Sequence, residues 1–541
     1  MSVRLYDVLR KTRACELPLF RCYSSSGDVT SHQDRTDGPV KRSWAPGSYV
    51  RPPRVDDKPL GDVDYGRQRN SVAPSAKQKR SQHQLKGDID KIFSDRNLCD
   101  EFLFTKFIKD GLQLCNTSNV ARFARLTGKK SRGQSNVLLK QYLPELAARV
   151  KVLPFSSWRF TDVSFVIYGL QTLDAKDDGY LDILTMMTKI GPVVIGGNDL
   201  LPPQNLSMML YGLQKNTCSD TSSLKLVELI TQMVAKCEEP LDAQAVGNAL
   251  YGLQSMSSDY YEVCHLVSAL VAKVDSCNES LGAQAVGNAL YGLQSMSSDS
   301  EEVRALVSAL VTKVEGCTES FSAQAVGTAL YGLKGMYSDS EEVRALLSAL
   351  APKVEGCKES LDAQNIGNAL FGLKGMRSDS EEVVELISAL TPQVQRCRVY
   401  LDPQGVGNAL YGMQGMSSDC AEVRALISVL LPKLQGCQSD LQAKNVGDAL
   451  YGLQSMSSDS VEVCALLDAL LPLVQGCKEI LSAERLSDAM NGLQGMEREN
   501  PTVAELLSAL AANVNSKVSR GNEENDENAE EERNEKKENL G

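Results

Sequence analysis

The chain has 541 residues, a net charge of −12 at pH 7 and only three histidines. No run of about 18 apolar residues occurs, so a membrane span is not expected, and three histidines are too few for a recurring zinc site. Charge is uneven: about +10 in residues 1–200, about −16 in 201–520 and about −6 in the remainder. The segments are therefore expected to meet different partners.

Residues 1–25 carry five basic residues and two acidic ones, with apolar residues between them. A basic, acid-poor, amphipathic leader of this kind resembles a mitochondrial presequence and predicts the mitochondrial matrix. The alternative is a disordered basic N-terminus without a targeting role. Residues 26–87 are rich in Ser, Asp, Gly, Pro, Arg and Lys, which predicts a disordered linker.

Residues 88–157 regain helical periodicity and hold the main positive patch of the chain. We expect a basic helical cap at the N-terminal end of a repeat array, because terminal repeats are normally atypical. The candidate RNA contacts in this cap are Arg122, Arg125, Lys129, Lys130 and Arg132.

A block of forty residues then repeats almost unchanged over residues 158–516. An aromatic residue recurs at the same place in most copies: Tyr168, Tyr211, Tyr251, Tyr291, Tyr331, Phe371, Tyr411 and Tyr451, with Asn491 in the last copy. A period of this size indicates a solenoid, in which each unit buries its apolar face against its neighbours. The sequence predicts an all-α, right-handed solenoid of about nine two-helix repeats, followed by an acidic disordered tail at 517–541.

Each unit contains two helices with local start signals. N-cap residues precede the first helix in several copies: Asp242, Ser322, Asp362, Asp402 and Ser482. In the second helix, Asp299 followed by Glu302 predicts a capping box.

Glycines and prolines mark further positions in the unit. Gly316 and its copies are expected to end the second helix in a left-handed conformation. Pro352 and its copies lie inside that helix and are expected to kink it. Gly247 and Gly252 recur inside or beside the first helix although glycine is unfavourable there, which predicts a close backbone approach for packing or for a ligand.

No catalytic arrangement is evident. Gly128-Lys129-Lys130-Ser131 lacks the upstream glycine of a phosphate loop, and three scattered histidines do not suggest a triad or a metalloprotease motif. The fifteen cysteines lack any CxxC pair, and the seven that follow the repeat (Cys237 and its copies) are expected to be small buried residues in a reducing compartment. We therefore expect no enzyme activity, cofactor or metal.

Amide side chains recur at two positions of the first helix. The candidate ladder is Gln244, Asn248, Gln284, Asn288, Gln324, Gln364, Asn368, Gln404 and Asn408. Base-reading repeats vary at such positions, so this uniformity suits hydrogen bonding between units, or contact with a homopolymer such as oligouridine. The negative array favours basic protein segments over RNA.

The phrase Val-Gly-Asn-Ala-Leu-Tyr-Gly-Leu-Gln, from Val286 to Gln294, is similar to the core of octotricopeptide repeats in organellar RNA factors. It also resembles the armadillo/HEAT-type repeat subunit of the kinetoplastid mitochondrial RNA-binding (RNA-editing accessory) complex. That resemblance implies a scaffold that organises basic or RNA-binding proteins of a multisubunit mitochondrial complex, with RNA bound indirectly. Direct RNA binding and a general mitochondrial assembly role are the alternatives, and the oligomeric state is open.

Overall fold

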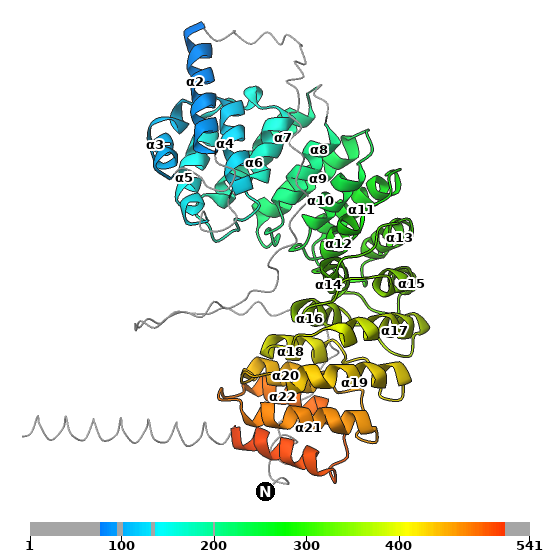
Figure 1. The fold of residues 1–541 in the computed structure, drawn as a ribbon. Coiled ribbons are helices and arrows are strands. Elements are labelled where there is room, and N and C mark those ends of the chain that lie inside the picture. Colours follow the sequence, from blue (N-terminus) through cyan, green and yellow to red (C-terminus); the bar gives the residue numbers. More distant parts are fainter. Residues whose placement is uncertain (1–75, 95–100, 131–135, 198–200, 514–541) are drawn as a thin grey trace, which may run out of the picture.

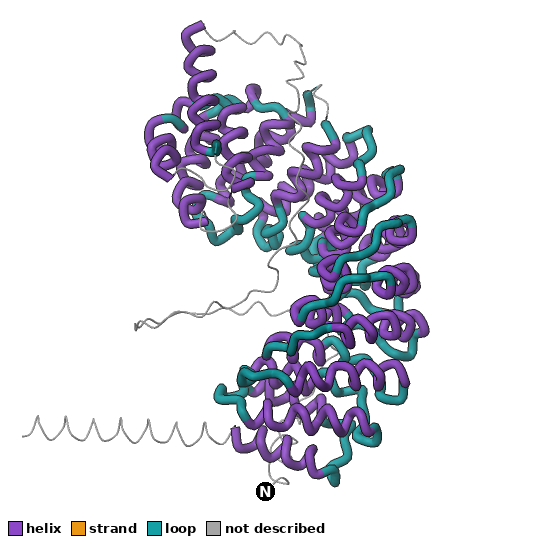
Figure 2. Tube along the Cα trace, viewed as in Figure 1, coloured by secondary structure: helices purple, strands orange, loops and turns teal. Residues whose placement is uncertain are grey.

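The computed structural model describes residues 76–94, 101–130, 136–197 and 201–513, and every regular element in these ranges is a helix. The all-α prediction is therefore confirmed (Figure 2). Four of the predicted features lie outside the described residues: the presequence at 1–25, most of the linker, Arg132 and the tail at 517–541.

The helices form two stacked layers, because the first helix of each unit packs on the first helix of the next and the second helices do the same. Figure 1 shows a curved array with α12, α14 and α16 on the inner side of the curve and α13, α15 and α17 on the outer side. The inner layer comprises α4 (Thr117–Lys130), α6 (Phe160–Tyr168), α8 (Pro203–Gly212), α10 (Ala243–Tyr251), α12 (Ala283–Tyr291), α14 (Ala323–Tyr331), α16 (Ala363–Gly372), α18 (Pro403–Tyr411), α20 (Ala443–Tyr451) and α22 (Ala483–Gly492). The outer layer comprises α5 (Asn136–Val152), α7 (Tyr180–Ile195), α9 (Thr221–Lys236), α11 (Tyr261–Asp275), α13 (Glu301–Glu315), α15 (Glu341–Glu355), α17 (Glu381–Arg396), α19 (Ala421–Gln435), α21 (Val461–Gln475) and the helical residues 501–513. From α6 onward the pairs make nine units, as the period predicts.

The N-terminal cap continues this stack rather than covering it with a different fold. Helices α4 and α5 pack on α6 and α7, while α2 (Ala76–Ile92) and α3 (Glu101–Asp110) close the end. The expected linker boundary at residue 88 falls inside α2, whose Leu85 and Ile89 are buried one turn apart. These two apolar residues hold the helix against the cap, although the polar composition around them predicted a disordered linker. An aromatic cluster fills the cap: Phe93, Phe104, Phe107, Phe123 and Tyr142.

A glycine at the end of each inner helix lets consecutive units approach closely. A Cβ added at Gly252 would overlap the carbonyl oxygen of Leu210, and one at Gly292 would overlap that of Leu250. The same overlap with the preceding unit recurs at Gly332, Gly372, Gly412, Gly452 and Gly492. Packing between units is therefore the reason for this glycine, since any side chain would push the helices apart.

Helix starts follow the predicted caps in the inner layer but shift by one residue in the outer layer. Asp242 accepts a hydrogen bond from the Ala245 amide at 2.6 Å, as expected of an N-cap. In α13 the N-cap is Ser300 rather than Asp299, and its hydroxyl donates to Glu302 at 2.7 Å. The prediction of Asp299 was wrong because serine and aspartate are adjacent cap-forming residues, and the backbone selects the second of them.

One prediction about the outer helices is also wrong, and the kink expected at Pro352 stays a prediction. Gly316 has φ −70° and is right-handed, so no left-handed residue ends α13. Helix α15 runs unbroken to Glu355 through Pro352 and is not split there. Pro352 lies on the exposed side of the helix, where water can satisfy the carbonyl that its ring leaves without a donor.

Hydrogen bonds between units add to the apolar contacts. Glu319 Oε2 accepts from the Ala283 amide at 2.8 Å, so a carboxylate of one unit caps the inner helix of the unit before it. The same arrangement joins Glu279 to Ala243, Glu359 to Ala323 and Glu479 to Ala443. On the other edge, the Ser298 hydroxyl accepts from the Tyr337 amide at 3.0 Å.

The glycine contact predicts opposite effects for two substitutions in α12 and its C-cap. We expect Gly292→Ala to lower the free energy of unfolding by roughly 1 to 3 kcal/mol, because its Cβ has no space beside Leu250. Gly287→Ala is the control: its Cβ would lie 3.6 Å from the Ala325 carbonyl oxygen, and alanine favours helix by about 1 kcal/mol. Urea unfolding followed by circular dichroism measures both. Equal stability of the two variants would contradict the packing role of Gly292.

Candidate binding surface on the concave face

The inner helices are almost free of charge. Helices α8, α10, α12, α14, α16 and α18 contain no Asp, Glu, Lys or Arg at all. The acidic residues of the array lie instead in the outer helices, such as Glu301 and Glu302 of α13, and in the loops, such as Glu319. The negative net charge therefore belongs mainly to the outer side and edges of the solenoid. The solvent-facing side of the inner helices and the turns after them is called the concave face below.

The predicted amide ladder lies on the concave face in two columns. Gln244, Gln284, Gln324 and Gln364 are exposed and Gln404 is partly exposed, each in the first turn of its helix. One turn further, Asn248, Asn368 and Asn408 are partly buried and Asn288 is 2% exposed. The Oδ1 atoms of Asn248 and Asn288 are buried without a hydrogen-bond partner, so at these two positions the predicted bond between units is not made through that atom.

Next to the asparagine column, the aromatic residues form a continuous stack along the array. Adjacent ring centroids lie 5.4–6.0 Å apart with interplanar angles of 17–30°, from Tyr168 through Tyr211, Tyr251, Tyr291, Tyr331, Phe371 and Tyr411 to Tyr451. Burial raises the pKa of Tyr331 and of Tyr411 to about 12. The rings pack on each other, so their faces are occupied within the array and only their edges can meet a ligand.

A second column consists of the residue three positions after the aromatic residue in each unit, which is glutamine in most units. It was not among the residues predicted from the sequence. Gln254 Nε2 donates to Gln214 Oε1 at 3.2 Å, and Gln294 Nε2 donates to Gln254 Oε1 at 3.5 Å. Here the amides do hydrogen-bond from unit to unit. Its signal in the sequence is a position that is glutamine in most copies and changes to lysine in two neighbouring ones.

Those two lysines, Lys334 and Lys374, lie in the middle of the column. Lys334 Nζ is 3.3 Å from Gln294 Oε1 and 4.9 Å from the centroid of the Tyr331 ring. Lys374 Nζ is 5.8 Å from the Phe371 ring centroid. Burial, followed by the charge of Lys374, lowers the pKa of Lys334 to about 8, and burial also lowers the pKa of Lys374.

The columns change character at the C-terminal end of the array. Asp448 and Asp488 replace the asparagine, and Arg485 pairs with Asp448 at 2.9 Å and with Asp488 at 3.2 Å. Burial raises the pKa of both carboxyls. A charged cluster therefore ends the uncharged part of the concave face.

The predicted basic patch is partly used within the fold. Arg122 Nε donates to Asp90 at 2.8 Å, and the Arg125 guanidinium lies 4.6 Å above the Phe165 ring. Lys129 is exposed on the same helix, Lys130 is its last residue, and Arg132 lies outside the described residues.

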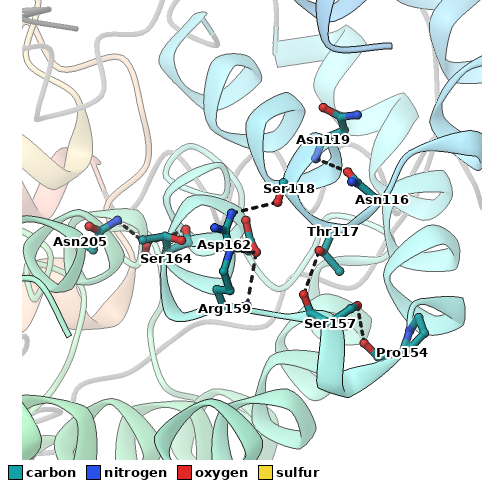
Figure 3. A network of polar contacts seen from close by, with 11 residues as sticks. Asn116, Thr117, Ser118, Asn119, Pro154, Ser157, Arg159, Asp162, Ser164 and Asn205 are labelled. Carbon is teal, nitrogen blue, oxygen red and sulfur yellow. Dashed lines mark hydrogen bonds and ion pairs between the residues drawn. The ribbon is translucent and has the colours of Figure 1, made fainter. Parts of the chain in front are cut away.

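Polar contacts join this cap to the first unit (Figure 3). Thr117 Oγ1 donates to the Ser157 carbonyl at 3.1 Å, and Arg159 donates to Ser118 at 3.0 Å. One unit further, Asn205 donates to Ser164 at 3.0 Å. The basic cap is thus continuous with the array.

The cysteines of the repeat follow the outer helices. Cys237, Cys277, Cys317, Cys357 and Cys397 are each 2% exposed, whereas Cys437 and Cys477 are partly exposed. Burial of the first five is as predicted. In the described part of the chain all cysteines are unpaired, no group of three or more His, Cys, Asp or Glu is placed to hold a metal, and no helix is both long and apolar enough to cross a bilayer.

No protein-family model matches the chain, and a search of curated proteins found no similar sequence. The structure of yeast Rmd9p in complex with a 16-nucleotide target RNA is similar over 78% of this chain and 85% of that chain, at 12% sequence identity and a TM-score of 0.30.

Replacing Lys334 by the glutamine of the other units should stabilise the fold at pH 7. The folded state disfavours the charged lysine, so its destabilising effect is complete below pH 8 and fades as the pH rises from there toward the pKa of an unfolded lysine. We expect Lys334→Gln to raise the free energy of unfolding by about 1 kcal/mol at pH 7, allowing for partial exposure and the lost ring contact, and by less at pH 9.5. Thermal unfolding at the two pH values measures this.

The matched control is Lys358→Gln, which removes an exposed lysine from a loop and should leave the midpoint unchanged. A gain from Lys334→Gln that did not depend on pH would contradict the assignment of the effect to the buried charge.

Proposed function

We propose that this chain is a non-catalytic interaction scaffold that holds an extended segment of a partner protein along its concave face. The observation that supports this most directly is the set of parallel columns on that face. Two amide columns and one aromatic column repeat with little change from α10 to α18, and a second column of glutamines and two lysines runs beside them. A surface that repeats along its length suits a ligand that also repeats along its length.

The spacing of the columns fits an extended polypeptide. Adjacent ring centroids are 5.4–6.0 Å apart, close to the roughly 6.6 Å that two residues of an extended chain span. Each amide side chain offers both donors and an acceptor, as each peptide group of a ligand would require. One unit can therefore serve two residues of a bound segment.

The proposed setting is mitochondrial RNA processing or editing, in the matrix. It is supported by the presequence-like leader and by the resemblance of the repeat core to organellar RNA factors. The acidic outer helices and loops would suit basic or RNA-binding proteins of the same assembly, which would place RNA near the scaffold without direct contact. Two faces of different charge would allow one chain to hold two kinds of partner.

Direct RNA binding is the second candidate, and one observation favours it. The concave face is uncharged rather than acidic, so it does not repel a nucleic acid as strongly as the net charge of the array implies. Against it, Arg122 is paired with Asp90, and phosphate neutralisation by lysine and arginine supplies most non-specific affinity.

Site-specific crosslinking in the full-length protein tests the proposal. A photo-reactive amino acid is placed either at Gln364, on the concave face of α16, or at Ser388, on the exposed side of α17 in the same unit. After irradiation in isolated mitochondria, with and without RNase, we expect protein adducts from position 364 that survive RNase.

Adducts of RNA from position 364 would establish the second candidate instead. Protein adducts that form only from position 388 would contradict the concave face as the main binding surface. Adducts with assembly or metabolic proteins alone would support the scaffold proposal but contradict a role in RNA processing.

A further inference from the structure

Two adjacent units place a lysine where the other units place glutamine, in the middle of the concave face. Lys334 comes three residues after Tyr331, and Lys374 comes three residues after Phe371. Both ammonium groups therefore lie beside the aromatic stack, one unit apart. The helices before them, α14 and α16, carry no charge. These lysines are thus a pair of positive charges directly beside two uncharged helices, and the next charged residues of the same turns are Asp339 and the paired Arg377 and Asp379.

No carboxylate among the described residues neutralises this pair. Neither lysine forms an ion pair there, whereas the neighbouring Arg304 and Arg344 of the outer layer pair with Glu342 and Glu382. Both lysines are partly buried, and the charge of Lys374 opposes that of Lys334. Holding two like charges this close without a counter-charge is unfavourable, and a bound anionic group would relieve it.

Resting on the proposed function, we propose that Lys334 and Lys374 bind two acidic side chains, two residues apart, on the extended segment that the concave face holds. Alternate side chains of an extended peptide point to the same side, so an Asp/Glu-x-Asp/Glu sequence presents two carboxylates to consecutive units. The lysine pair fixes the register of the segment, since the uniform columns on either side allow it to slide by whole units.

A peptide fits this face better than a nucleic acid does. A single strand laid along the array would carry a phosphate at every nucleotide, and the stretch from α8 to α18 with its following turns offers few cations besides this pair. The faces of the aromatic rings are also occupied by one another, which removes the stacking that single-stranded nucleic acids use.

Selection from a random 12-residue peptide display library against the full-length chain tests this inference. We expect peptides with two acidic residues separated by one residue to be enriched by about tenfold over the starting library, equivalent to ~1.4 kcal/mol. The variant Lys334→Gln with Lys374→Gln, which restores the glutamine of the other units, should lose that enrichment. Lys334→Glu with Lys374→Glu should enrich basic residues at the same spacing.

The control variant is Lys225→Gln with Lys358→Gln, which removes the same charge from exposed positions in α9 and a loop and should keep the acidic preference. Peptides that bind equally to the control and to the Lys334/Lys374 variants would overturn the inference while leaving the scaffold proposal intact. Failure to enrich any peptide, together with lysine-dependent binding of a 12-nucleotide oligouridine, would overturn both.

The acidic C-terminal tail of this chain is another occupant that the same experiment separates. Glu523, Glu524, Asp526 and Glu527 are replaced by Gln or Asn in the full-length protein. Acidic enrichment that appears only after this change would show that the tail fills the site in cis and would overturn a partner segment as its occupant.

Discussion

The close approach of consecutive inner helices is the constraint on which the rest of the architecture depends. At Gly252, Gly292 and their copies the backbone of one unit lies against a carbonyl of the unit before it. This contact sets the short distance between units, and the short distance brings the rings of Tyr251 and Tyr291 to 5.6 Å. Like charges at this spacing would repel one another, which agrees with the absence of charged residues from the helices α8 to α18.

The same constraint explains why the net charge of the array does not describe its concave face. Composition gives the sum of charges but not their placement, and the acidic residues are mostly excluded from the crowded inner layer. Many have structural tasks instead: Glu319 caps α12 in the preceding unit, and Glu342 pairs with Arg304. What remains exposed on the inner helices from α8 to α18 is polar and neutral, and charges such as Lys334, Lys374 and Asp339 lie in the turns that follow them.

Features set by local sequence could be predicted, and so could the close approach at Gly252, because a glycine retained in a helix signals it. Other contacts between units could not be predicted. The period, the two-helix unit and the cap at Asp242 follow from neighbouring residues, and the structure agrees. The position of the cap at Ser300 and the right-handed conformation of Gly316 did not follow from the residue types at those positions. The hydrogen bond between Gln254 and Gln294 joins residues 40 positions apart, so it depends on how the two units lie against each other.

The caps supplied by Glu279, Glu319 and Glu359 give the array a direction. Helices α10, α12, α14 and α20 each receive this cap on the first amide from a glutamate that lies 36 residues further along the chain. Along the run from α10 to α14, fraying from the C-terminal side would remove a cap from the next helix inward, while fraying from the N-terminal side would not. The helix starts in this run therefore depend for their stability on the units that follow them and not on those that precede them.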